Sequence, residues 1–322
     1  GLIANGTAIA VAFKKYAFPA YYFGVGIAEH NLTYLLLYTV CTLVVFELVY
    51  AILSRSFRQI TTAKKGTARI KYKERSMHVS SPAAALLRKD FRHFIGNPMY
   101  VLNAWMGEIL LVVACVAMLI KKDILTEFLP ILNGEGEIMG LILCVILCGL
   151  SCTNLITAPS ISLEGKNLWI AQSIPVPAAT VLRAKVKLQM LLCIPITALS
   201  ALLMGIVLKL ELLTLVLAVL VPAAFNLFTA LLGVVVNLHF PKFDYINETV
   251  VIKQSMSTMI CMFGSMAVVL VLALLYALLL SASVAPTLFL AVCLVLLVIV
   301  CVLMWRYLGH GGSARFAALQ AD

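Results

Sequence analysis

Long apolar runs, separated by shorter polar segments, dominate this chain. A helix needs about 20 apolar residues to cross the hydrocarbon core of a bilayer. Seven runs are long enough, over residues 33–53, 100–120, 138–158, 188–208, 212–238, 259–280 and 286–305. The pattern predicts an all-α integral membrane protein, a bundle of about seven transmembrane helices in a domain that covers residues 33–322. Residues 1–32 would form an outer interfacial segment or the tail of an upstream span.

The composition indicates that lipid surrounds most of this apolar surface. Hydrophobic residues make up 63% of the chain and charged residues 12%, with a mean hydropathy of +1.05, whereas soluble domains carry about 25% charged residues. A soluble fold could not cover so much apolar surface. The formal net charge of +10 fits basic loops on one side of a membrane, so we expect the lipid bilayer, and not nucleic acid, as a partner.

The basic residues lie mostly in alternate loops. If the segments 54–99, 159–187, 239–258 and 306–322 face the cytoplasm, 19 of the 24 Lys and Arg residues are on that side. The other five are Lys14, Lys15, Lys121, Lys122 and Lys209. Because cytoplasmic loops of membrane proteins are enriched in Lys and Arg, this distribution predicts a multipass plasma-membrane protein with a cytoplasmic C-terminus.

The sequence gives no indication of an enzyme active site. It lacks the G-x-x-x-x-G-K-[ST] motif that cradles nucleotide phosphates, and no paired carboxylates or His/Asp cluster lie at a predicted membrane interface. Cys144, Cys148 and Cys152 recur at every fourth position, but small residues at this spacing are typical of close helix packing. We therefore expect no catalytic residue, no cofactor and no metal ion in this chain.

Polar residues inside the predicted spans are candidates for function: Glu108, Asn103, Glu47 and Asn226. An acidic side chain at the centre of a membrane helix costs about 2.5–3.5 kcal/mol on insertion scales, so such groups usually face the bundle interior or a cavity. Glu108 is the best candidate for a substrate-path or gating residue, with a structural hydrogen bond between spans as the open alternative. For Glu47 and the asparagines the structural interpretation is favoured.

A short helix is predicted just before the second span. Ser80-Ser81-Pro82 is a typical helix start, because Ser can cap the first turn and Pro fits within it. Four apolar residues share one face of this helix: Leu87, Phe91, Phe94 and Ile95. Such a face suits a helix on the membrane surface, and Gly96-Asn97-Pro98 should end it. The helix either couples the spans to a partner or anchors on anionic lipid.

The segment between the third and fourth predicted spans is a second polar island on the same side. Gly165 permits a sharp backbone turn. Glu164 and Lys166 offer charges to a partner, and Trp169 offers a large apolar anchor with a donor edge. The alternative is a solvated loop that carries an interfacial tryptophan.

Both segments resemble those of a known family. Residues 162–176, SLEGKNLWIAQSIPV, resemble the S-x-E-G-K-x-x-W-I-x-x-S-x-P-V/I segment of permease subunits in a large family of bacterial ABC exporters. Residues 87–100, LRKDFRHFIGNPMY, resemble the L-x-K-[DE]-x-x-x-F/I-x-x-[SN]-P-x-Y segment that precedes a span in the same family. The resemblance implies that this chain is the C-terminal half of a larger permease, driven by an ATPase on a separate polypeptide. The residues it implicates in ATPase coupling are Glu164, Gly165, Lys166, Trp169, Phe91 and Arg92.

The leading hypothesis is accordingly a permease subunit of an ATP-driven ABC exporter, with an ABC ATPase subunit as its main partner. A second copy of the permease is a further partner that the sequence leaves open. Two other functions also remain open: an ion-coupled or passive membrane transporter, and a membrane scaffold without transport activity. Co-purification with an ATPase, together with substrate-stimulated ATP hydrolysis, would distinguish the first function from the others.

Overall fold

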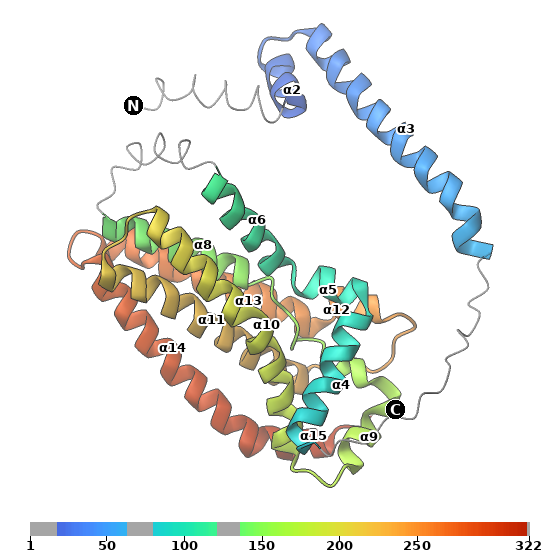
Figure 1. The fold of residues 1–322 in the computed structure, drawn as a ribbon, viewed down its shortest axis with the longest axis vertical. Helices are drawn as coiled ribbons and strands as arrows, with labels where there is room; N and C mark the ends of the chain where they lie inside the picture. Colours follow the sequence, from blue (N-terminus) through green and yellow to red (C-terminus); the bar gives the residue numbers. More distant parts are fainter. Residues whose placement is uncertain (1–17, 63–79, 121–135, 321–322) are drawn as a thin grey trace. The chain divides into compact units, whose positions relative to one another are not determined.

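The computed structural model describes residues 18–62, 80–120 and 136–320, and within these ranges the chain is helical with no β-strand (Figure 1). The chain divides into two compact units, Gly1–Met77 and His78–Asp322. The all-α fold class is therefore confirmed for the described part of the chain.

The first unit contains a helical hairpin of α2 (Phe18–Ala28) and α3 (Leu32–Thr62). In the turn between them, His30 adopts the left-handed region with φ 51°. The Asn31 side chain then caps α3, because its Oδ1 accepts a hydrogen bond from Thr33 N at 3.0 Å. Helix α3 is long and apolar enough to cross a membrane, which confirms the helix of the first predicted span.

The second unit is a bundle built around α11 (Leu212–His239), which packs against four other long helices. These neighbours are α8 (Gly136–Ser151), α10 (Ala178–Val207), α13 (Met256–Leu275) and α14 (Pro286–Gly309). Helix α13 continues into a short π-helix, η3 (Tyr276–Leu280). Apolar side chains of the long helices, including Leu147, Ala218 and Phe225, fill the space between them.

The remaining helices of this unit are α4 (Pro82–Gly96), α5 (Pro98–Ala104), α6 (Met106–Ile120), the 3₁₀-helix η2 (Ser162–Asn167), α9 (Leu168–Ser173), α12 (Glu248–Gln254) and α15 (Gly311–Ala318). Helices α4 and α6 both pack against α10. Helices α9 and α15 meet at the end of the bundle where α10 begins and α14 ends, because Gln172 Nε2 donates to Phe316 O at 2.8 Å and to Leu319 O at 2.9 Å.

Five described helices are long and apolar enough to cross a membrane, or six if the bent pair α5 and α6 counts as one span. This is the pattern of a multipass membrane protein, but the predicted count of about seven spans is not confirmed. The main difference is the third predicted span, 138–158, because α8 ends at Ser151 and residues 152–161 are irregular. Hydropathy does not distinguish a helix that is buried in lipid from an irregular segment that is buried inside the protein.

The fourth predicted span begins earlier than expected. Helix α10 starts at Ala178 rather than at 188, so the basic residues Arg183, Lys185 and Lys187 lie in its first turns. Charged residues lower the hydropathy of these turns without lowering their helix propensity, since Lys and Arg are good helix formers.

The predicted helix start and helix break before the second span are both confirmed. Ser81 Oγ accepts from Ala84 N at 3.4 Å, and Pro82 occupies the first turn of α4. Asn97 ends this helix and caps the next one, with its Oδ1 accepting from Tyr100 N at 3.1 Å. The second span is itself bent by 65° between α5 and α6.

The apolar face predicted for α4 is divided in the structure. Of its four residues, Phe94 is buried and Leu87 is half-buried, whereas Phe91 and Ile95 are exposed. The helix packs against α10, and it turns Asp90, rather than Phe91, towards that neighbour. The side chains of α4 that are buried are therefore determined by its packing against α10, and not by the hydrophobic pattern alone.

Candidate functional site

The irregular segment 152–161 enters the bundle, and side chains of α10 and α11 satisfy its backbone. Gln189 on α10 accepts from Thr157 N at 3.0 Å and donates to Asn154 O at 2.9 Å. Asn237 on α11 accepts from Ile161 N at 2.8 Å. Irregular backbone is tolerated at membrane depth only where protein supplies such partners, so these two side chains hold the segment in place.

Residues from other helices complete this support. Tyr100 on α5 donates from its hydroxyl to Ile156 O, and Ser257 on α13 donates to Ala158 O at 2.8 Å. At the break between α5 and α6, Leu155 N donates to Ala104 O at 2.8 Å. Hydrogen bonds therefore join the segment to α5, α10, α11 and α13.

A sharp backbone turn inside η2 requires a glycine at position 165. Gly165 has φ 53° and ψ −136°, a conformation that side-chain-bearing residues rarely adopt. A Cβ atom there would lie 2.9 Å from the Tyr245 hydroxyl oxygen. That hydroxyl donates to Leu163 O at 3.2 Å, so Tyr245 covers the turn and holds it closed.

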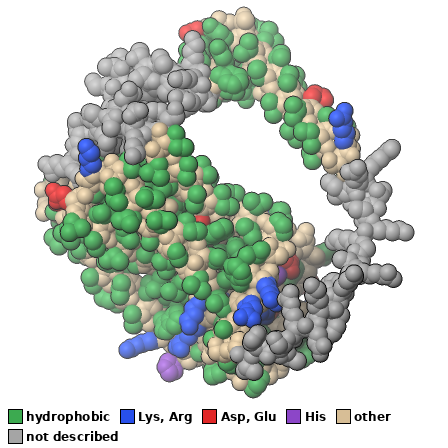
Figure 2. All heavy atoms as spheres, viewed as in Figure 1, with side chains coloured by type: hydrophobic (Ala, Val, Ile, Leu, Met, Phe, Trp, Pro, Cys, Tyr) green, Lys and Arg blue, Asp and Glu red, His purple; other side chains and the backbone are tan. Residues whose placement is uncertain are grey.

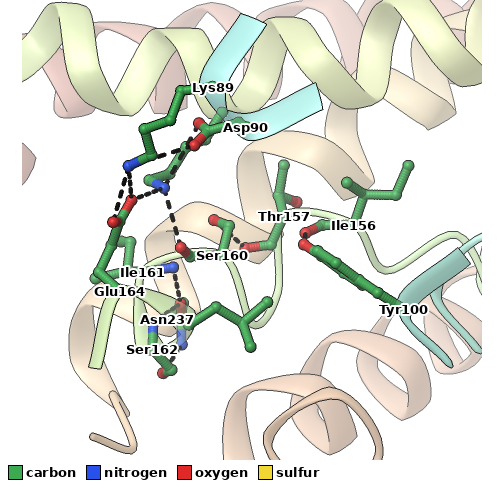
Figure 3. Close-up of polar contacts among 12 residues, drawn as sticks. Lys89, Asp90, Tyr100, Ile156, Thr157, Ser160, Ile161, Ser162, Glu164 and Asn237 are labelled. Atoms are coloured by element: carbon green, nitrogen blue, oxygen red, sulfur yellow. Dashed lines mark hydrogen bonds and ion pairs between the residues drawn. The ribbon is translucent and has the colours of Figure 1, made fainter. Parts of the chain in front are cut away.

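Four charged residues meet beside this turn, and we call them the four-charge cluster: Lys89, Asp90, Glu164 and Lys185. Figure 3 labels the first three of them. Lys89 Nζ lies 2.7 Å from Glu164 Oε1 and 2.8 Å from Oε2. Lys185 Nζ donates to Glu164 Oε1 at 2.8 Å and to Ser160 O at 3.0 Å. Asp90 lies 3.6 Å from each lysine. The cluster joins α4, η2 and α10.

The electrostatics of the cluster keep Glu164 ionised. Burial by itself raises the pKa of this carboxyl, but the charges and hydrogen bonds of Lys185 and Lys89 outweigh burial and lower the pKa from 4.5 to about 2. The Lys185 side chain is only 3% exposed. Removing one partner of a buried ion pair typically costs about 3–5 kcal/mol, because the other charge stays buried.

A third polar segment, residues 240–254, also contacts η2 and α4. Lys242 N donates to Ser162 Oγ at 2.9 Å, and Asn97 Nδ2 donates to Glu248 Oε2 at 2.6 Å. His93 Nε2 lies 3.5 Å from Glu248 Oε1. Helix α12 thus connects to α4 through Glu248, and the loop before α12 connects to η2 through Lys242 and Ser162.

Helix α9 presents a different face outward. Leu168 and Ala171 are buried against the bundle, whereas Trp169 is 64% exposed and Ile170 is also exposed. Lys166 precedes them at the surface. We call η2 and α9 together the η2–α9 corner. Its outward face consists of Trp169 and Ile170 beside Lys166.

The structure separates the six residues implicated in coupling into two groups. The carboxylate of Glu164 and the turn at Gly165 lie inside the corner, whereas the remaining four are exposed: Lys166, Trp169, Phe91 and Arg92. The contact from α4 to η2 runs through Lys89, not through the exposed pair on α4. Lys89 and Asp90 were within the quoted motif, but Lys185, Tyr245 and Asn237 carried no sequence signal that linked them to it.

A second polar network lies within the membrane-length helices. Glu108 on α6 is 1% exposed, and its Oε1 accepts from Asn154 Nδ2 at 2.9 Å and Thr197 Oγ1 at 2.8 Å. Asn226 Nδ2 donates to Thr197 Oγ1 at 2.9 Å and to Ser151 Oγ at 3.0 Å. Glu108 Oε2 has no hydrogen-bond partner among the described residues.

The other two polar candidates are not part of this network. Asn103 Nδ2 donates to Met99 O at 2.6 Å, within its own helix. Glu47 lies exposed on α3 in the first unit. In the part of the chain that the structure describes, no group of three or more His, Cys, Asp or Glu side chains is placed to hold a metal ion.

Comparison with known families identifies one family for this chain. A family model described as a putative ATP-binding cassette matches residues 4–306. No curated protein and no solved structure matches the chain. The identification as the C-terminal half of a permease in a bacterial ABC exporter family is wrong, because the matching family is of the nucleotide-binding type and is not a permease family.

Proposed function

The chain belongs to the family described as a putative ATP-binding cassette, and we propose that it is the membrane-spanning component of an ABC transport system. In this proposal a separate ATPase binds and hydrolyses the nucleotide, and this chain provides the path that a substrate takes across the bilayer.

Two observations support the division of labour between two polypeptides. Five described helices have the length and composition of membrane spans. A phosphate-binding loop follows a β-strand and opens a helix, but residues 18–62, 80–120 and 136–320 contain no strand, and the sequence has no G-x-x-x-x-G-K-[ST] motif. ATP hydrolysis therefore fits a partner better than it fits this chain.

The observation that carries the proposal is the construction of the η2–α9 corner. Its outward face exposes Trp169 and Ile170, while its inward side is joined by the four-charge cluster to α4 and α10 and by Asn237 to α11. Coupling between distant sites travels through contiguous networks of this kind. A displacement of α9 by a partner would therefore be transmitted to α4, α10 and α11.

The proposed orientation places this corner in the cytoplasm. The basic residues are concentrated on this side of the predicted topology. Because Gln172 on α9 contacts Phe316 and Leu319, the described C-terminal residues share the same end of the bundle. An ATPase in the cytoplasm would therefore meet α9 and α15 together.

One observation favours a second candidate, an ion-coupled transporter. The buried carboxylate of Glu108 has one oxygen without a described partner, and intramembrane acids often mark ion or proton paths. Such a transporter would move substrate without ATP, so the same experiment distinguishes the two functions.

The test begins with the complex isolated from native membranes and reconstituted in nanodiscs. We expect it to hydrolyse ATP, and we expect the chain separated from its partner neither to hydrolyse ATP nor to be labelled by a photoreactive ATP analogue. Specific labelling of the separated chain would contradict the division of labour. Substrate transport by that chain without ATP would favour the ion-coupled alternative.

A pair of matched variants tests the corner itself. Trp169→Ala removes an exposed anchor of the kind that often contributes about 2 kcal/mol or more at an interface centre. Leu212→Ala removes another exposed apolar side chain, at the opposite end of the bundle. We expect only Trp169→Ala to reduce recovery of the ATPase and the hydrolysis that it catalyses. Equal recovery and hydrolysis in both variants would contradict docking at α9.

A further inference from the structure

A groove runs along the surface between α11 and α14. Its volume is about 270 Å³, and its apolar walls include Leu227 and Leu231 on α11 and Val298 and Val302 on α14. At one end the lining changes to Trp305 and Arg306. The groove is therefore apolar along its length and basic at a single end.

We expect the basic end to lie at the level of the lipid headgroups. Trp305 and Arg306 belong to the last two turns of α14, a helix of membrane length. Tryptophan favours the membrane interface, and a terminal arginine extends its guanidinium towards the headgroups. Figure 2 shows Lys and Arg side chains along the lower edge of the bundle, beneath a surface that is almost entirely hydrophobic.

The neighbouring helix α10 contributes one cation that contacts this end and a second cation one helical turn away from the first. The Arg183 guanidinium carbon lies 5.1 Å from the centre of the Trp305 ring, and Lys187 follows one helical turn later on the same face and is exposed. Among the described residues, none of Arg183, Lys187 and Arg306 forms a salt bridge. Arg183 Nε is also buried without a hydrogen-bond partner in that part of the chain.

We propose that this groove binds an anionic phospholipid, with one acyl chain along the α11–α14 seam and the phosphate at Arg306, beside Arg183 and Lys187. The apolar length excludes a free phosphate as the natural occupant, because such an ion would leave the groove uncovered. Charge complementarity excludes a neutral lipid, because three cations would remain without counter-charge. Basic pockets between membrane helices commonly recognise anionic headgroups in this way.

The site is tested by native mass spectrometry of the full chain, with phosphatidylglycerol and phosphatidylcholine of identical acyl chains. We expect phosphatidylglycerol to bind more tightly to the wild type. Arg306→Gln should weaken its binding about fivefold, since a basic residue near an anionic headgroup contributes about 1 kcal/mol. Lys253→Gln removes an exposed positive charge on α12, away from the groove, and should leave the preference unchanged.

A matched pair of variants tests the apolar part of the groove. Val298→Trp fills the groove, whereas Val295→Trp places the same side chain on an exposed position of α14 that does not line it. Only Val298→Trp should weaken both lipids, with the melting temperature showing that each variant is folded. Equal binding of the two lipids by the wild type, equal effects of Arg306→Gln and Lys253→Gln, or full competition by inorganic phosphate would overturn the proposal.

Discussion

Neutralising Glu164 should release the η2–α9 corner from the helices behind it. Glu164→Gln keeps the size of the side chain but removes the charge that two lysines share. Lys185, which is almost completely buried, would then retain only Asp90, at 3.6 Å, as an anionic neighbour. The variant leaves the interaction of Asn237 with η2 intact, so the effect should be local to the four-charge cluster.

The structure sets the expected magnitude. The lowering of the pKa of Glu164 from 4.5 to about 2 corresponds to about 3 kcal/mol, at 1.36 kcal/mol for each pH unit. The Glu164 side chain is only 13% exposed, so solvent screening reduces this value little. Because Asp90 still compensates part of the charge on Lys185, we expect Glu164→Gln to lower the free energy of unfolding by about 2–3 kcal/mol.

The sign of the pH dependence follows from the lowered pKa. The folded-state pKa lies below the unfolded one, so the stabilisation is fully present above about pH 5 and is lost as the pH falls towards about 2. Wild-type stability should therefore decrease across this window through a contribution that Glu164→Gln lacks. Reversible unfolding in mixed micelles, followed by tryptophan fluorescence, measures both effects.

A double-mutant cycle with Lys185→Met isolates the interaction from the loss of either side chain alone. Glu211→Gln is the control, since Glu211 is an exposed acid at the opposite end of the bundle and should change stability by less than about 0.5 kcal/mol. A coupling energy near zero, or equal losses for Glu164→Gln and Glu211→Gln, would refute the electrostatic account of the corner.

Three further outcomes follow from other features. Glu108→Gln should preserve the amount of folded protein in the membrane and Glu108→Leu should reduce it, because only leucine removes the acceptor that the buried Asn154 and Thr197 side chains share; equal amounts by quantitative blotting would contradict the network. Gly165→Ala should lower the free energy of unfolding by about 1–3 kcal/mol through backbone strain, and Tyr245→Phe should restore only part of it, since the positive φ remains; complete restoration would mean that the steric contact alone is responsible. A membrane-impermeant maleimide should label Leu212→Cys on intact cells and Lys166→Cys only after permeabilisation, with the reverse pattern excluding the proposed orientation.

The sequence was sufficient for helices whose apolar runs coincide with a membrane crossing. Helix α11 matches its predicted run over 212–238 within one residue, and α14 starts where predicted at Pro286. It was not sufficient where burial inside protein replaces burial in lipid. Residues 152–158 end the apolar run 138–158 and are mostly buried in the bundle, yet their backbone bonds to Gln189 and Tyr100 instead of forming a helix.

In the candidate site too, the sequence predicts local features but not contacts between residues that are far apart in the chain. The turn at Gly165 and the exposure of Trp169 follow from residue type and neighbouring sequence. The partners of Glu164 do not, because Lys89 lies 75 residues before it and Lys185 lies 21 residues after it. Which of the many basic residues would pair with this acid was decided by the packing of α4 and α10, which hydropathy does not report.

The irregular segment between α8 and α9 has a consequence for the biogenesis of the chain. The Gln189 side chain that satisfies Thr157 lies 32 residues further on, and the Asn237 side chain that satisfies Ile161 lies 76 residues further on. During synthesis from the N-terminus, the segment therefore leaves the ribosome long before its partners. An unsatisfied backbone cannot stay in lipid, so this stretch must remain in water or in the insertion machinery until α11 has been made.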